Sequence, residues 1–156
     1  MTERQPSSRS CFVCGRENGG GLRARWESDR EAGEVRATVS VAEHFNGYPG
    51  VVHGGILAAL MDEAMVRTGL LEGGFDDLKV TARMEVTYRR ATPTGAPLAV
   101  VARMVKRGGT RARAEAEVRL GDGTVTARAE ALLVKAPPEV ASGWAAERPF
   151  WRVDEG

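Results

Sequence analysis

The stretch HFNGYPGVVHGGILAALMDEAMV, residues 44–66, decides the fold. It contains both histidines of the chain, a Gly-Gly pair and an Asp-Glu pair. From Gly54 to about Thr68, apolar residues recur at the i, i+3, i+4 spacing of an amphipathic helix. Alanines and a valine extend the apolar character around the other side, so other structure is expected to enclose this helix. Gly69 and the EGG at 72–74 are typical helix ends.

Segments on both sides of the helix alternate between apolar and polar residues, which is the period of a half-buried strand. Before the helix, alternation within 22–41 around the turn SDREAG predicts a β-hairpin. After it, runs separated by Gly- and Pro-rich turns predict four strands, at 78–88, 97–106, 110–120 and 124–134. The first of these is expected to carry on one face Leu78, Val80, Ala82, Met84, Val86 and Tyr88. This order predicts an α+β fold, an antiparallel sheet of about six strands curled around one long central helix.

The bulk properties exclude several classes of protein. The 156 residues are 42% hydrophobic and 28% charged, which is ordinary for a soluble globular domain with a substantial core. A net charge of +1 gives no reason to expect a nucleic-acid partner. No apolar run is long enough to span a bilayer, and the polar start lacks the apolar core of a signal peptide. We therefore expect no membrane partner and, by default, a cytoplasmic location.

Three parts are expected along the chain. Residues 1–10 are polar and predicted to be disordered, and residues 11–136 form the folded domain. The tail over 137–156 holds two of the three tryptophans and is either a docked extension or an arm that contacts a partner.

Several motifs together resemble one family. GYPGVVHGG followed by LMDEAM, with CFVCG upstream and VTYRRATPTG downstream, resembles the hotdog-fold thioesterases, and within them the PaaI-like branch that acts on acyl-coenzyme A (acyl-CoA). The similarity runs from about Cys11 to Val134. It implies the hotdog fold, an acyl-CoA substrate, and a homodimer or a dimer of dimers (a homotetramer) with active sites between subunits. It implies no cofactor, since coenzyme A enters as part of the substrate.

The same resemblance assigns the site. It places the family's catalytic acid on Asp62 and its oxyanion-polarising backbone N–H on Gly54 or Gly55. Residues that would orient the loop, hold water or a carbonyl, or support the acid are His53, Asn46 and Thr81.

The residues themselves give physical reasons for part of this assignment. N–H groups in the first turn of a helix are unpaired and lie at the positive end of its dipole, where they can stabilise an oxyanion. Glycines at 54 and 55 leave room for an acyl group, although close packing of the helix end is the structural alternative. His53 is alternatively a core histidine that fixes the loop. Thr81 is equally well interpreted as an ordinary strand residue on the opposite side from Val80.

The two adjacent acids differ in their helical neighbours. Glu63 has Arg67 one turn later, which predicts an i, i+4 ion pair on a solvated face. Asp62 has no basic residue on its own helix face, and a carboxylate among small apolar residues is costly unless a site uses it. As a general base Asp62 would activate water, and as a nucleophile it would form an anhydride; the sequence does not choose.

Other polar groups are weaker candidates. Cys11 and Cys14 form a single CxxC without a second ligand pair, so no metal is expected and a structural role is favoured. Basic residues that would contact the coenzyme A phosphates are Arg89, Arg90, Lys106 and Arg107. The leading function is hydrolysis of an acyl-CoA thioester. The alternative is a non-catalytic hotdog module that binds acyl-CoA.

Overall fold

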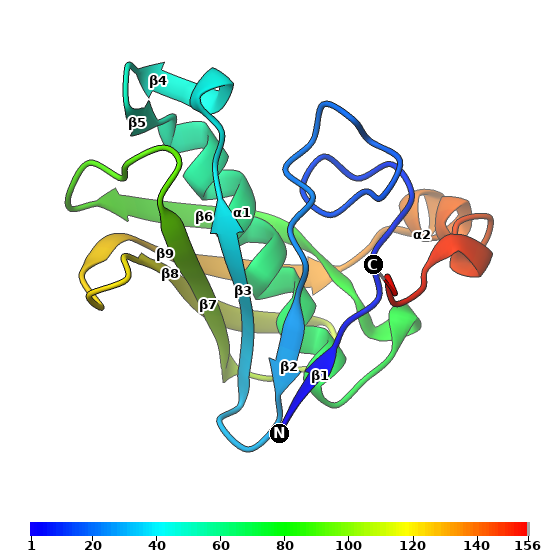
Figure 1. Cartoon of the computed structure of the whole chain (residues 1–156). Coiled ribbons are helices and arrows are strands. Elements are labelled where there is room, and N and C mark those ends of the chain that lie inside the picture. The colour runs from blue at the N-terminus through cyan, green and yellow to red at the C-terminus, as the bar shows by residue number, and fades with distance from the viewer. Residues whose placement is uncertain (156) are drawn as a thin grey trace.

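A computed structural model describes residues 1–155. One antiparallel sheet of seven strands curls around a single long helix, α1 (Gly54–Arg67), as Figure 1 shows. The strands follow the order β1 (Thr2–Arg4), β2 (Glu27–Asp29), β3 (Glu34–Ser40), β7 (Pro97–Lys106), β8 (Arg111–Arg119), β9 (Val125–Lys135) and β6 (Lys79–Tyr88). The expected α+β hotdog arrangement is confirmed, and β1 is the strand beyond the six that were predicted.

The remaining elements are short. A two-stranded ribbon of β4 (Asn46–Tyr48) and β5 (Val51–Val52) leads into α1. The tail contains helix α2 (Pro138–Trp144). Single 3-10 turns span Glu43–Phe45, Thr68–Leu71, Phe75–Asp77 and Arg148–Phe150. Within residues 1–155, no helix has the length and apolar character needed to cross a membrane.

The core lies between α1 and the concave face of the sheet. Leu60, Met61 and Met65 of α1 are fully buried, and each such side chain contributes about 1.5–3 kcal/mol of transfer free energy. The sheet offers them small side chains, since the buried positions on β8 and β9 include Ala112, Ala114, Ala116, Ala127, Ala129 and Ala131. Because alanine projects little beyond the backbone, the sheet approaches the helix closely.

Strand β6 contains a bulge that changes which side chains face the helix. Thr81 lies opposite Leu133 of β9, whereas Arg83 already lies opposite Leu132, so one extra residue is accommodated between them. Leu133 is buried, and Thr81 therefore points to the helix side together with it. The strict alternation predicted for 78–88 is wrong for this reason, and Ala82 is exposed.

Strand β6 is also the open edge of the sheet. It pairs with β9 along its whole length, and no other strand among residues 1–155 pairs with its outer edge. A ten-residue edge with free backbone N–H and C=O groups is a ready template for another chain.

The N-terminal segment is ordered, in contrast to the disorder predicted for residues 1–10. Strand β1 pairs with β2, and beyond it Gln5 and Ser7 are buried. Ser7 also pairs with Arg152 of the tail as an isolated β-bridge.

The tail is a docked extension. The Phe75 ring lies 6.2 Å from the Trp144 ring and 5.6 Å from the Trp151 ring, both edge to face. Arg9 forms an ion pair with Glu147 of the tail at 2.7 Å.

Arg67, at the end of α1, lies where the N-terminal segment and the tail meet. Its side chain is 2% exposed and forms an ion pair with Glu63 at 2.9 Å. Its guanidinium donates to the Pro6 carbonyl at 2.8 Å and lies 5.0 Å from the centroid of the Trp151 ring. One buried cation on α1 thus contacts two segments that are distant in sequence, the N-terminal segment and the tail.

Candidate active site

The start of helix α1 presents one uncommitted N–H group. His53 is the N-cap, and its Nδ1 accepts a hydrogen bond from the Gly55 N–H at 2.9 Å. The His53 carbonyl accepts from the Ile56 N–H at 2.9 Å. The Gly54 N–H donates to no group within residues 1–155. Of the two glycines predicted to polarise a carbonyl, Gly54 therefore has the free donor, at the positive end of the helix dipole.

Tyr88, at the end of β6, covers this helix start. Its hydroxyl donates to the Gly54 carbonyl at 2.6 Å, and burial raises the pKa of Tyr88, so the phenol stays protonated as a donor. A Cβ at Gly54 would lie 3.2 Å from the Tyr88 ring, so a larger residue here would displace the tyrosine slightly. The sequence pattern marks Tyr88 only as a strand position, and it could not show that this side chain contacts the start of α1.

Two hollows flank His53. The larger, about 730 Å³, is lined by Gly54, Tyr88, Arg89, Arg90 and residues of the ribbon and the loop that follows β6. The smaller, about 390 Å³, is lined by His44, Phe45, Asn46, His53, Gly55 and Ile56. Because Gly54 lines the larger hollow, a ligand in that hollow could place its carbonyl next to the free N–H.

Asn46 lies in the smaller hollow with its amide already engaged. Its Nδ2 donates to the Glu43 carboxylate at 2.9 Å, and that carboxylate also accepts from the Gly50 N–H at 2.9 Å. Hydrogen bonds from the Thr94 hydroxyl and this loop lower the pKa of Glu43, so it stays ionised. This arrangement fixes the loop, while the Asn46 side-chain carbonyl and the second N–H of its amide have no recorded partner within residues 1–155.

Asp62 and Thr81 are brought together. The Thr81 hydroxyl donates to Asp62 Oδ1 at 2.5 Å, and both side chains are half-buried. The β6 bulge makes this possible, since without it Thr81 would face away from the helix. Asp62 has no ion-pair partner within residues 1–155, so a single hydroxyl orients an uncompensated carboxylate.

Glu63 is not on a solvated face, contrary to the prediction. The expected ion pair with Arg67 forms, but the Glu63 side chain is only 15% exposed. Its other oxygen accepts a hydrogen bond from the Cys11 thiol at 3.1 Å. Burial raises the pKa of Glu63 to about 7.

The free glycine N–H and Asp62 of one chain are too far apart to act on one carbonyl. They are eight positions apart on α1, and a rise of 1.5 Å per residue separates them by roughly 12 Å along the axis. A thioester bound at one helix start therefore needs an acid from elsewhere.

The four basic residues predicted to contact phosphates do not form one cluster. Arg89 and Arg90 line the larger hollow. Strand pairing across β6, β9, β8 and β7 places Tyr88 level with Val100 of β7. Lys106 is six residues beyond Val100, which is roughly 20 Å along the strand direction. Arg107, next to Lys106, forms an ion pair with Glu72 at 3.4 Å. The two pairs lie at opposite ends of the sheet.

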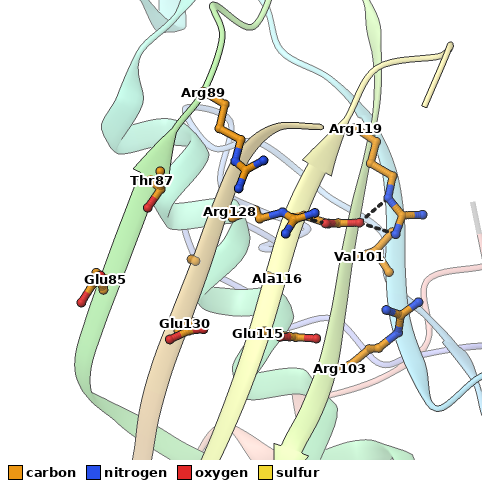
Figure 2. Close-up of a pocket in the computed structure, with 12 residues that line it drawn as sticks. Glu85, Thr87, Arg89, Val101, Arg103, Glu115, Ala116, Arg119, Arg128 and Glu130 are labelled. Atoms are coloured by element: carbon orange, nitrogen blue, oxygen red, sulfur yellow. Dashed lines mark hydrogen bonds and ion pairs between the residues drawn. The ribbon is translucent and has the colours of Figure 1, made fainter. Parts of the chain in front are cut away.

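The outer face of the sheet carries a further hollow, of about 510 Å³ (Figure 2). Acidic and basic side chains line it, and many are already paired: Glu117 forms ion pairs with Arg119 and with Arg128, the latter at 3.3 Å. Glu115 and Glu130 lie directly opposite each other on β8 and β9. Strand residues and Arg89 line this hollow and the start of a helix does not contribute to it, so we place the candidate active site at α1.

Comparisons with known proteins agree with this arrangement. The sequence profile described as "thioesterase superfamily" matches residues 49–127, just over half of the chain, and includes helix α1 and strands β6, β7 and β8. A mouse protein, acyl-coenzyme A thioesterase THEM4, is 28% identical over 108 residues, which are 67% of this chain and 45% of that protein. The chain thus spans less than half the length of this curated relative.

Solved structures give the same result for the fold. A thioesterase superfamily protein, RHA08564, superposes with a TM-score of 0.74 at 30% identity, over 81% of this chain and 60% of that one. PaaI from Escherichia coli superposes with a TM-score of 0.59 at 20% identity, over 65% and 76% of the two chains, which shows a shared fold. With a family profile matched over more than half of its residues, the chain belongs to the thioesterase superfamily.

Proposed function

We propose that this protein hydrolyses the thioester of an acyl-coenzyme A to a carboxylic acid and free coenzyme A. Membership of the thioesterase superfamily and the name of the mouse relative support this activity. One observation carries it. Asp62 of α1 is half-buried, has no ion-pair partner within residues 1–155, and accepts a hydrogen bond from the Thr81 hydroxyl of β6, while the start of the same helix presents a free N–H. Hydrolysis of a thioester needs both groups.

The chemistry follows from these two groups. The thioester carbonyl accepts a hydrogen bond from the Gly54 N–H, and one such donor stabilises the developing oxyanion by about 2.7–4 kcal/mol. As a general base, Asp62 takes a proton from the water that attacks the carbonyl carbon. As a nucleophile, it attacks that carbon and water then hydrolyses the anhydride. In both routes the C–S bond breaks and the sulfur leaves as the thiolate of coenzyme A.

The separation of the two groups on one helix leads us to a site built by two copies. In a homodimer, or in each half of a dimer of dimers, the start of one α1 would meet Asp62 of the other. The open edge of β6 supports this assembly, because pairing across it joins the two sheets and satisfies the free backbone groups.

The remaining residues receive supporting roles. His53 and Asn46 fix the loop before the helix through the Gly55 and Glu43 contacts. Arg89 and Arg90, which line the larger hollow, would contact the phosphates of coenzyme A. Arg107, which forms an ion pair with Glu72, is not proposed to contact the phosphates.

The test is loss of thioester absorbance with a panel of short, long and aromatic acyl-CoAs. We expect Asp62→Asn and Asp62→Ala to lower kcat by about 10²–10⁴, the usual contribution of a general base. The matched control is Glu85→Gln, an exposed acid on the same strand as Thr81, which should keep the wild-type rate. If both Asp62 variants turn over the best substrate as fast as wild type, the assignment is wrong. Tight binding of an acyl-CoA without turnover would favour the non-catalytic module.

A further inference from the structure

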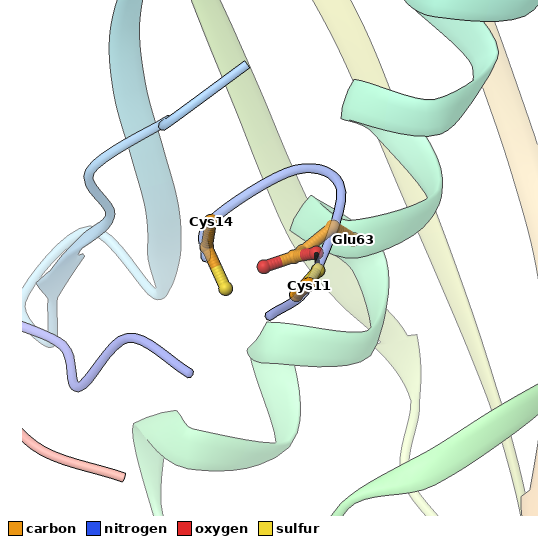
Figure 3. A group of neighbouring side chains, drawn as sticks. All are labelled: Cys11, Cys14 and Glu63. Atoms are coloured by element: carbon orange, nitrogen blue, oxygen red, sulfur yellow. Dashed lines mark hydrogen bonds between the residues drawn. The ribbon is translucent and has the colours of Figure 1, made fainter. Parts of the chain in front are cut away.

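Two cysteine thiols and one carboxylate meet beside the middle of α1. The ligand atoms of Cys11, Cys14 and Glu63 all lie within 4.8 Å of one another. Figure 3 shows the cysteines on a tight loop and Glu63 reaching from α1 toward them. Cys11 and Glu63 are 52 positions apart in sequence, which is why the sequence showed only two of the three groups.

The loop that carries the cysteines is shaped around the first sulfur. The Val13 N–H donates to Cys11 Sγ at 3.3 Å, and the Gly15 N–H donates to the Cys11 carbonyl at 2.7 Å. A Cβ at Gly15 would lie 2.4 Å from that carbonyl oxygen, so the turn requires glycine directly after the second cysteine. An N–H directed at a sulfur favours the thiolate, which is the form that binds metals, whereas the hydrogen bond with Cys14 and burial raise the pKa of Cys11 in this structure.

The charges around the cluster also fit a divalent cation. Cys14 is 1% exposed, and neither it nor Glu63 is well hydrated. Two thiolates and one carboxylate carry three negative charges, which Arg67 and one divalent cation balance. The Cys11 thiol donates a hydrogen bond to Glu63, and a hydrogen bond from Cys11 lowers the pKa of Cys14.

We propose that Cys11, Cys14 and Glu63 bind a zinc ion, with water as the fourth ligand. Thiolates select zinc over magnesium or calcium, and a carboxylate is an accepted third ligand. Two sulfurs bound to one zinc lie about 3.8 Å apart at Zn–S distances of about 2.3 Å. Ligand atoms within 4.8 Å reach this geometry by small side-chain rotations. Binding forms two Zn–S bonds and one Zn–O bond and displaces to solvent the protons that the ligand atoms carry.

The ion would fasten the CFVCG loop to α1 at the residue next to Asp62. This would be a structural role, because none of the three ligand residues lines either hollow at His53. The inference does not depend on thioesterase activity, since its readout is metal binding.

The experiment uses the full-length protein, reduced, stripped with a chelator and titrated with Co²⁺ and then Zn²⁺. We expect one ion per chain, the thiolate-to-cobalt charge-transfer band of a tetrahedral site, release of protons on binding, and protection of both thiols from alkylation. Cys11→Ser and Glu63→Gln should weaken binding by more than about 100-fold, beyond the loss usual for an outer-shell partner. His44→Ala, which removes an exposed histidine outside the cluster, should bind as wild type does.

Cys11, which is partly exposed, carries the test because Cys14 is fully buried and its replacement can prevent folding. Circular dichroism establishes that each variant is folded. The proposal is overturned if folded, reduced wild type takes up no ion. It is equally overturned if Cys11→Ser binds as tightly as wild type, or if the thiols only form a disulfide under a mild disulfide oxidant and bind no metal when reduced.

Discussion

Replacing Thr81 by valine isolates the contact that orients the proposed catalytic acid. Valine keeps the size and the β-branched shape of threonine, so strand β6 and its bulge should persist. What is lost is the 2.5 Å hydrogen bond to Asp62. Because both side chains are half-buried, water replaces this bond only in part.

The magnitude follows from the charge of the acceptor. Hydrogen bonds to charged groups contribute about 1.5–3 kcal/mol. At 1.36 kcal/mol per tenfold in rate, complete loss of that orientation lowers kcat/KM by about 10- to 150-fold. Thr81→Ser, which retains a hydroxyl, should recover most of the rate.

The assay is acyl-CoA hydrolysis followed by thioester absorbance, at a temperature well below the melting transition of every variant. A double-mutant cycle with Asp62→Asn adds a second readout. If Thr81 acts through Asp62, Thr81→Val costs little further activity once the acid is gone. Wild-type kcat/KM in Thr81→Val, alongside an inactive Asp62→Asn, would refute the reasoning.

Three other changes follow from the site. Gly54→Ala should lower kcat, because the new Cβ would lie 3.2 Å from the Tyr88 ring, beside the free N–H. Gly69→Ala meets nothing closer than 3.5 Å and should leave kcat unchanged in the same assay. Glu63→Gln breaks a buried ion pair and should lower the free energy of urea unfolding by about 3 kcal/mol. Glu72→Gln, which breaks an exposed pair, should change it by less than about 1 kcal/mol. Arg90→Ala should raise KM for acyl-CoA several-fold yet leave KM for acyl-pantetheine unchanged, and equal effects on both would exclude a phosphate contact.

Much of the fold could be predicted because its signals are local. The period of α1 and the alternation over 110–120 and 124–134 depend only on neighbouring residues, and the observed β7, Pro97–Lys106, coincides with the predicted range. The β6 bulge could not be predicted, since an extra residue is defined only against the partner strand. The order of residues 1–10 was missed for a similar reason, because a polar segment gains its stability from distant partners.

The site divides in the same way. The glycines and Asp62 were recognisable because their motif is contiguous, and Thr81 because it follows the helix at a short distance. Tyr88 and the environment of Glu63 depend on contacts between segments far apart in the chain. The supposed solvation of Glu63 was inferred from helical neighbours alone, and the loop that covers it comes from the N-terminal part of the chain.

Arg67 has a consequence for the way in which the protein opens. It joins the carbonyl of Pro6, the carboxylate of Glu63 and the ring of Trp151 in one buried contact set. Loss of any one partner leaves a buried cation partly uncompensated, so these segments cannot fray independently at low cost. In hydrogen exchange, amides of the first residues, the last turn of α1 and the docked tail should exchange as one cooperative unit.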